Sequence, residues 1–155
     1  MGRAADPNAR SPAIRLASAE DGFGLSELLG ILGYPCPPEE ASQRVLDLRL
    51  DRNQTLMVAA DAQGSLLGLV CCDLSYYLPL GAPTCRITAL AVDPKAQRRG
   101  VGRLLLREAE RLAREAGAVR IELTSAPHRL EAHAFYRACG YGDGALRFVR
   151  RLGDA

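Results

Sequence analysis

The most distinctive chemical feature of the sequence is a basic, glycine-containing stretch from Asp93 to Arg103, DPKAQRRGVGR. An amphipathic stretch that predicts a helix follows it directly. Gly100 and Gly102 remove side chains where backbone N–H groups would face a ligand, and a helix N-terminus adds N–H groups without helical partners. After Asp93 the stretch carries no acid, but it carries the cations Lys95, Arg98, Arg99 and Arg103. The combination indicates a phosphate or pyrophosphate cradle; the alternative is a surface loop that happens to be basic.

Two familiar phosphate-binding motifs do not fit this stretch. A Walker A loop needs GxxxxGK[ST], which the sequence lacks. A dinucleotide fingerprint needs GxGxxG early in a βαβ unit, whereas here only Gly100-Val-Gly102 is present, followed by Arg-Leu-Leu.

The cysteines and histidines do not suggest metal or nucleophilic chemistry. The chain has five cysteines and two histidines, with no CxxC pair and no spacing typical of metal ligands. Cys71 and Cys72 lie in an apolar run, so at least one of them should be a core residue. We therefore expect reduced thiols, no bound metal and a cytoplasmic location.

Composition limits the remaining classes of protein. The chain has 155 residues, 48% hydrophobic and 25% charged, which is typical of one globular domain. A net charge of +2, 5% aromatic residues and no Trp disfavour nucleic-acid binding by charge or base stacking. No apolar run is long enough to span a membrane. We expect a flexible N-terminal tail over residues 1–11 and a single domain over residues 12–155.

The order of secondary-structure elements predicts a mixed α/β (α+β) sheet with helices on both faces. The expected order is βαα, then a ββ hairpin, then βαβαβ. The expected strands are 13–17, 55–60, 65–77, 85–92, 119–124 and 145–152, and the expected helices are 23–32, 37–50, 101–116 and 130–139.

Three segments of the sequence carry a resemblance to a known family. Gln97-Arg-Arg-Gly-Val-Gly102 resembles the acetyl-coenzyme A loop of the GCN5-related N-acetyltransferase superfamily, whose pattern is Q/R-x-x-G-x-G/A. Residues 87–94 resemble the fourth strand of that family, and Ala132-His-Ala-Phe-Tyr-Arg-Ala-Cys-Gly-Tyr141 resembles its A-x-x-F/L-Y-x-x-x-G-F/Y helix. The resemblance covers about residues 12–152. It implies a twisted, mostly antiparallel central sheet whose fourth and fifth strands are splayed.

The resemblance also implies how acetyl-coenzyme A would bind. The pyrophosphate would be held by the loop and the start of the helix, and the pantetheine arm would pair with the fourth strand like an added strand. A backbone N–H near Leu90 would polarise the acetyl carbonyl. Arg129 stands where the family often has an Asn that contacts pantetheine. Phe135 is also expected to contact the cofactor. The implied cofactor residues are Leu90, Ala91, Val92, Gln97, Arg98, Arg99, Gly100, Val101, Gly102, Arg103, Arg129 and Phe135.

For catalysis, Tyr136 matches the family's usual general acid, which donates a proton to the departing thiolate. Without the resemblance, a tyrosine packed on a core helix would be the simpler interpretation. Thr88 stands where many relatives carry a glutamate base, and it cannot serve as one. His133, Asp73, Glu122 and an ordered water are the alternatives for that function.

These observations predict an N-acetyltransferase that transfers the acetyl group of acetyl-coenzyme A directly to a primary amine, in a ternary complex. We expect a small-molecule acceptor contacted by Tyr34, Asp73 and Tyr76. The alternatives are a protein or peptide N-acetyltransferase and a catalytically silent acyl-coenzyme A-binding module. The resemblance also makes a homodimer plausible.

Overall fold

The computed structural model describes residues 11–153, so nearly all of the tail predicted for residues 1–11 lies outside the described residues. The chain forms two compact units, one up to Glu122 and one from Leu123 onward. Of the four α-helices within residues 11–153, the first unit holds three together with most of the sheet, and the second holds the last. The single domain predicted for residues 12–155 stays a prediction.

The sheet has five strands in the order β1-β2-β3-β4-β5, and the first four are successively antiparallel. The strands are β1 Ala13–Leu16, β2 Gln54–Ala60, β3 Leu66–Tyr77, β4 Ala82–Val92 and β5 Ile121–Leu123. At the start of β4, Cys85 N–H donates to Arg120 O (2.8 Å) and Val119 N–H donates to Pro83 O (3.0 Å). Residue numbers increase in the same direction on both segments, from Pro83 to Cys85 and from Val119 to Arg120. The segment leading into β5 therefore begins parallel to β4. The prediction of a mixed, mostly antiparallel sheet is confirmed.

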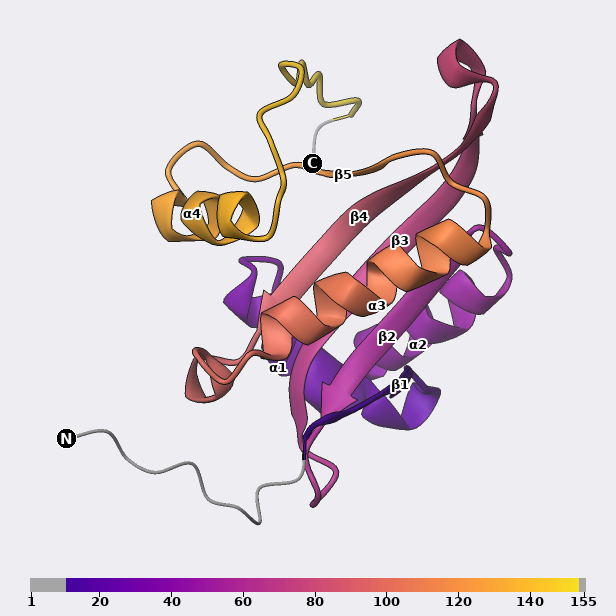
Figure 1. Ribbon diagram of the computed structural model, residues 1–155. Helices are drawn as coiled ribbons and strands as arrows, with labels where there is room; N and C mark the ends of the chain where they lie inside the picture. The colour runs from indigo at the N-terminus through magenta and orange to yellow at the C-terminus, as the bar shows by residue number, and fades with distance from the viewer. Residues whose placement is uncertain (1–10, 154–155) are drawn as a thin grey trace, which may run out of the picture. The chain divides into compact units, whose positions relative to one another are not determined.

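Helices cover both faces of the sheet in the first unit, as expected (Figure 1). Helices α1 (Gly22–Ile31) and α2 (Pro38–Arg49) share a buried core with Leu69 of β3. Helix α3 (Val101–Glu115) lies on the other face and buries Val101, Leu105, Leu106, Ala109 and Ala113. A Cβ at Gly68 would lie 2.9 Å from Leu105 Cδ1, so the glycine permits the close approach of α3. Helix α4 (Leu130–Ala138) belongs to the second unit.

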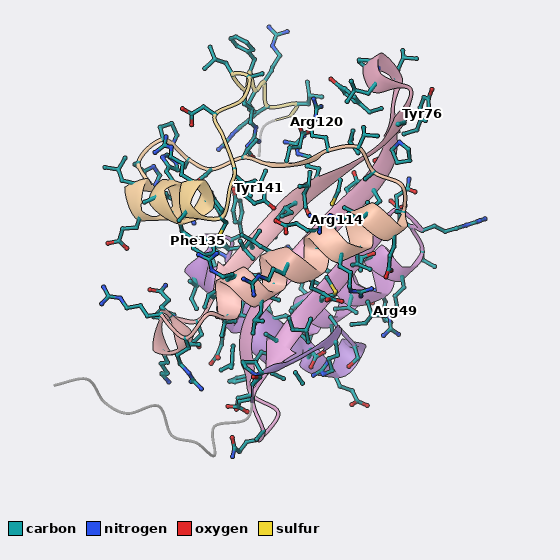
Figure 2. All side chains as sticks on the ribbon, in the orientation of Figure 1. Arg49, Tyr76, Arg114, Arg120, Phe135 and Tyr141 are labelled. Carbon is teal, nitrogen blue, oxygen red and sulfur yellow. The ribbon has the colours of Figure 1, made fainter. Side chains whose placement is uncertain are left out.

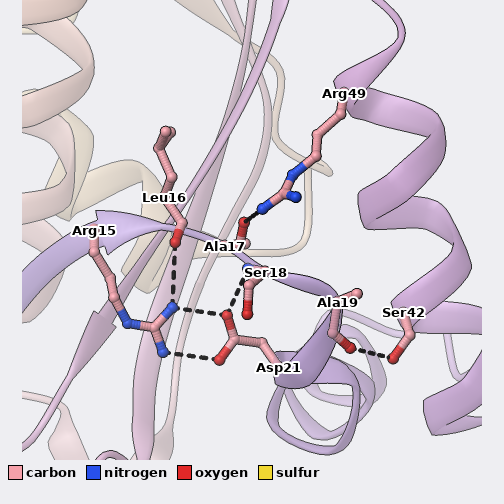
Figure 3. Close-up of polar contacts among 8 residues, drawn as sticks. All are labelled: Arg15, Leu16, Ala17, Ser18, Ala19, Asp21, Ser42 and Arg49. Atoms are coloured by element: carbon pink, nitrogen blue, oxygen red, sulfur yellow. Dashed lines mark hydrogen bonds and ion pairs between the residues drawn. The ribbon is translucent and has the colours of Figure 1, made fainter.

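A polar network holds the segment from β1 to the start of α1 against α2 (Figure 3). The Arg15 guanidinium donates two hydrogen bonds of 2.8 Å to the Asp21 carboxylate, and Ser18 N–H donates to the same group at 2.8 Å. Arg49 donates to Ala17 O (3.1 Å), and the Ser42 hydroxyl donates to Ala19 O (2.7 Å). These bonds satisfy carbonyls that lie between β1 and α1, where no strand or helix partner is present.

Two sequence-based expectations about strands are corrected. Residues 145–152 form no strand, and Leu146, Phe148 and Leu152 are 83%, 90% and 91% exposed. Alternating apolar residues make a strand only where a neighbouring backbone completes the ladder, and the alternation alone does not supply one. β4 begins at Ala82 rather than residue 85, because Gly81 adopts a left-handed conformation (φ 63°) that closes a short turn after Leu80.

Candidate active site

The centre of β4 contains a β-bulge at Thr88. Cys71 of β3 pairs with Ala89, but the next residue, Cys72, pairs with Ile87, so Thr88 has no partner across the ladder. The Thr88 hydroxyl donates to Cys71 O at 3.4 Å. Bulges interrupt strand pairing and re-aim side chains, and they are common beside active sites. Thr88, at the position expected to match the family's base, is therefore set apart from the regular alternation of the strand.

Beyond the bulge, the backbone of β4 presents alternate peptide groups to opposite sides. Asp93 N–H donates to Leu67 O (2.8 Å). Every second residue before it, Ala91 and then Ala89, is therefore also in a hydrogen-bonded pair with β3. The N–H groups of Leu90 and Val92 then point away from β3. This is the arrangement needed to pair with an added strand, as predicted for the pantetheine arm along Leu90, Ala91 and Val92.

The basic loop that follows β4 is shaped by Asp93 and by two left-handed residues. Asp93 Oδ1 accepts the Lys95 N–H (2.9 Å), and Asp93 O accepts the Ala96 N–H (2.8 Å), which makes a short turn with Ala96 buried. Arg98 has φ 65° and is the single non-glycine residue with positive φ among residues 11–153. Gly100 follows with φ 78° at the N-cap of α3. The loop thus turns sharply twice before it enters the helix.

The start of α3 has the properties of an anion site. The first helical bond runs from Leu104 N–H to Gly100 O (3.0 Å), so the N–H groups of Val101, Gly102 and Arg103 precede it. The first turn contains no acidic residue. Lys95, Arg98, Arg99 and Arg103 form no ion pair with any carboxylate of residues 11–153, and Gln97 is exposed beside them. Unpaired cations and helix N–H groups at one place favour a bound phosphate or pyrophosphate.

Near the bulge, Thr88 and Asp73 both adjoin the buried thiol of Cys71. Burial raises the pKa of Cys71, the hydrogen bond with Thr88 opposes the rise, and the negative charge of Asp73 adds to it. Asp73 Oδ1 accepts a hydrogen bond from the Ser75 hydroxyl at 2.8 Å. The structure therefore brings two of the predicted site residues together on one stretch of the sheet. The Cys71 thiol is kept protonated and is not a nucleophile.

The other two predicted acceptor contacts are aromatic and exposed. Tyr76 lies at the end of β3 and is 67% exposed (Figure 2). Tyr34 lies after α1 and is 70% exposed, and its N–H donates to Leu29 O (2.9 Å). No described contact joins Tyr34 to Asp73 or Tyr76, so the structure does not bring these three together through direct interactions between residues 11–153.

In the second unit, Tyr136 lies on α4 between two aromatic rings. The Phe135 ring is 5.5 Å from the Tyr136 ring, and Tyr141 meets it edge-on at 6.3 Å; Figure 2 labels both neighbours. Burial raises the pKa of the Tyr136 phenol, and the nearby charge of Arg129 partly opposes this effect. The phenol is therefore protonated at neutral pH and can donate a proton. Arg129, Phe135 and Tyr136, three of the residues predicted to bind cofactor or act in catalysis, lie together in this unit.

The remaining candidates for a base each have one polar partner in the structure. His133 Nε2 lies 2.9 Å from Ala126 O, and since a carbonyl only accepts, this ring nitrogen carries a proton. Glu122 forms an ion pair with Arg120 at 3.5 Å.

Among the described residues, no group of three His, Cys, Asp or Glu side chains could hold a metal, and no helix is long and apolar enough to cross a membrane.

Sequence reasoning missed the bulge and missed Arg86, which pairs with Asp73 across the β3–β4 ladder. Both the bulge and the pairing of Arg86 depend on the register between β3 and β4, which the local sequence does not show. The bulge shifts this register by one residue. A signal was present for Gly68, since a lone glycine within a strand pattern indicates the close approach of another element.

Comparison with known proteins identifies the family. A model of the Acetyltransferase (GNAT) family matches residues 25–141. The aminoalkylphosphonate N-acetyltransferase of Salmonella typhimurium is 33% identical over 89 residues, which make up 57% of this chain and 58% of that protein. The aminoglycoside N(6')-acetyltransferase type 1 of Stenotrophomonas maltophilia is 27% identical over 136 residues, 86% of this chain and 88% of that protein. The chain thus spans little more than half the length of the first of these relatives.

Solved structures share the fold. A GNAT family acetyltransferase of Staphylococcus aureus has a TM-score of 0.78 and 20% identity, covering 92% of this chain and all of its own. This likeness concerns the fold alone, whereas the family model extends from α1 to the residues after α4. Because that model covers well over half of the sequence, the chain belongs to the acetyltransferase (GNAT) family.

Proposed function

We propose that this protein transfers the acetyl group of acetyl-coenzyme A directly to a primary amine of a small molecule, in a ternary complex. The observation that carries the proposal is the loop of residues 97–103, where unpaired cations meet the N-terminus of α3 in a chain of this family. Residues 97–103 would hold the pyrophosphate. Leu90 to Val92 would pair with the pantetheine arm, and the N–H of Leu90 would donate to the acetyl oxygen.

The reaction requires one bond to form and one to break. The neutral amine nitrogen attacks the thioester carbonyl carbon, and the carbon–sulfur bond then breaks with both electrons going to sulfur. The amine loses one proton before attack and one after it, and the coenzyme A thiolate takes up one proton. We assign that last proton to Tyr136, whose phenol is protonated because burial raises its pKa.

Of the two protons lost by the amine, the one released after attack can restore the Tyr136 phenol, and the one lost before attack needs an acceptor. Glu122 is paired with Arg120, and His133 donates its Nε2–H to Ala126 O, so the nitrogen of His133 that could accept a proton is Nδ1. Thr88 has no basic group, so its contribution is the bulge that it forms. We propose that an ordered water near Asp73 takes the proton, with the carboxylate drawing the ammonium group into place.

The relatives support a small-molecule acceptor, because two of them are named for aminoalkylphosphonates and aminoglycosides. A protein or peptide acceptor and a silent acyl-coenzyme A-binding module are the other candidates. The absence of a basic side chain at Thr88 is what favours the silent module. A cytoplasmic location and a homodimer stay predictions, and size-exclusion chromatography with light scattering tests the latter.

The test is to follow free thiol released from acetyl-coenzyme A by purified protein supplied with simple amines, amino acids, aminoglycosides or peptides. We expect release that depends on a small amine. Release with peptides alone would replace the proposed acceptor class. Thermal stabilisation by acetyl-coenzyme A without release, with every acceptor, would indicate a binding module.

A further inference from the structure

Three polar residues form a row across neighbouring strands of the sheet. Gln54 of β2 pairs with Asp73 of β3, and Asp73 pairs with Arg86 of β4. Directly opposed residues of antiparallel strands project from the same face, with Cβ atoms about 5 Å apart. The row therefore places Asp73 and Arg86, an acid and a base, opposite each other on one face of the sheet.

The row lies on the face that α1 and α2 cover, beyond the end of their buried core. Leu69 of β3 belongs to that core and is 2% exposed. Cys71 and Asp73 follow at steps of two residues and so share its face, in agreement with the 3.9 Å between Cys71 Sγ and Gln54 Oε1. Burial decreases along this line of β3, from Leu69 and Cys71, both buried, to Asp73, half-buried, and Arg86 opposite Asp73 on β4 is exposed. The row is thus accessible and lies beside the bulge at Thr88.

The two opposite charges of the row do not neutralise each other. Asp73 accepts its hydrogen bond from Ser75 at 2.8 Å, and neither Asp73 nor Arg86 forms an ion pair within residues 11–153. Other arginines of the same unit are paired, such as Arg15 with Asp21 and Arg44 with Glu40. A ligand with both charges could bind here without first breaking a bond between the two side chains.

From this juxtaposition we propose that the acceptor is a short zwitterionic amine, and that Arg86 is the residue that selects it. Asp73 attracts the ammonium group of the acceptor, and Arg86 binds its acidic group, a carboxylate, phosphonate or phosphate. The inference rests on the proposed function, because it names the acceptor class of that reaction. Because the two residues are direct cross-strand neighbours, the row suits a short acceptor in which few atoms separate the nitrogen from the acidic group.

Three acceptors with the same four-atom chain test the class: 4-aminobutanoate, n-butylamine and 1,4-diaminobutane. They present an anionic, a neutral and a cationic group at the end away from the reacting nitrogen. We expect kcat/KM for 4-aminobutanoate to exceed that for n-butylamine at least tenfold, with 1,4-diaminobutane acetylated most slowly. Equal values for the first two, or a preference for the diamine, would overturn the inference while leaving the proposed function intact. No thiol release with any amine would instead overturn the proposed function.

Variants test the residue. Arg86→Gln should raise KM for 4-aminobutanoate about tenfold with little change in kcat, and should leave KM for n-butylamine and for acetyl-coenzyme A unchanged. Arg86→Lys keeps the charge and should recover part of the loss. Arg107→Gln removes an exposed charge from α3, on the other face of the sheet, and should change none of these three KM values. An equal effect of Arg86→Gln on both acceptors would exclude Arg86 as the specificity residue.

Discussion

At the scale of single residues, Tyr136 as general acid should affect the rate of the reaction and not the binding of acetyl-coenzyme A. Tyr136→Phe removes the proton donor but keeps the ring contacts with Phe135 and Tyr141, so the second unit should fold normally. General acids contribute about a hundredfold or more to a rate. We expect kcat to fall by about that factor with KM for acetyl-coenzyme A nearly unchanged. Steady-state thiol release measures both constants, and an unchanged kcat would remove Tyr136 from the mechanism.

Gly100 makes a second prediction at this scale, because its φ of 78° is disfavoured for residues with a side chain. A Cβ there would meet no atom within 4 Å, so backbone strain is the only penalty. Left-handed backbone costs about 1–2 kcal/mol, which corresponds to about tenfold in affinity where the loop must hold this shape for the ligand. Gly100→Ala should therefore weaken coenzyme A binding about tenfold in calorimetry. Gly144→Ala, at an open site without positive φ, is the matched control.

At the scale of elements, the packing of α3 on the sheet depends on Gly68. A methyl group there would lie 2.8 Å from Ala91 O and 2.9 Å from Leu105 Cδ1, and the carbonyl cannot give way without moving β4. Gly68→Ala should lower the free energy of unfolding by about 1–3 kcal/mol, as overpacking does. It should also weaken coenzyme A binding, because the N-terminus of α3 shifts. Urea titration measures this loss, and Gly30→Ala in α1, which meets nothing within 4 Å, should be neutral or slightly stabilising in the same experiment.

The elements also show how far the sequence alone could predict the molecule. α3 was predictable because its apolar period and the glycines at both ends agree. The strand predicted over residues 145–152 was wrong, because a strand depends on a ladder partner that the local pattern does not reveal. For the same reason the pairing of Arg86 with Asp73 could not be predicted. It depends on the register between β3 and β4, which the bulge at Thr88 shifts by one residue. The cradle of residues 97–103 was visible because its parts are contiguous, whereas an acceptor site assembled across strands was not.

At the scale of the whole molecule, resistance to acid should depend on Asp21. This carboxylate joins β1 to the start of α1 through Arg15 and Ser18, and its side chain is only 10% exposed. The hydrogen bonds from Arg15 hold the pKa of Asp21 below its usual value of 3.8, although burial opposes this. Protons therefore bind more readily to Asp21 in the unfolded chain than in the folded protein. The stabilisation is complete above about pH 5 and declines as pH falls through the folded-state pKa.

Asp21→Asn tests this linkage, since asparagine keeps the size of the side chain but cannot ionise. Hydrogen bonds to charged groups contribute about 2 kcal/mol, so the variant should be less stable by about that amount at pH 7. The difference from the unaltered protein should shrink as the pH is lowered from 5 towards 2, because the natural carboxylate then loses its charge as well. Asp47→Asn is the control, because Asp47 lies on exposed α2 surface and accepts one hydrogen bond from Gln43. Urea titrations at several pH values measure the difference, and one that stays constant with pH would show that the Arg15–Asp21 pair does not control acid unfolding.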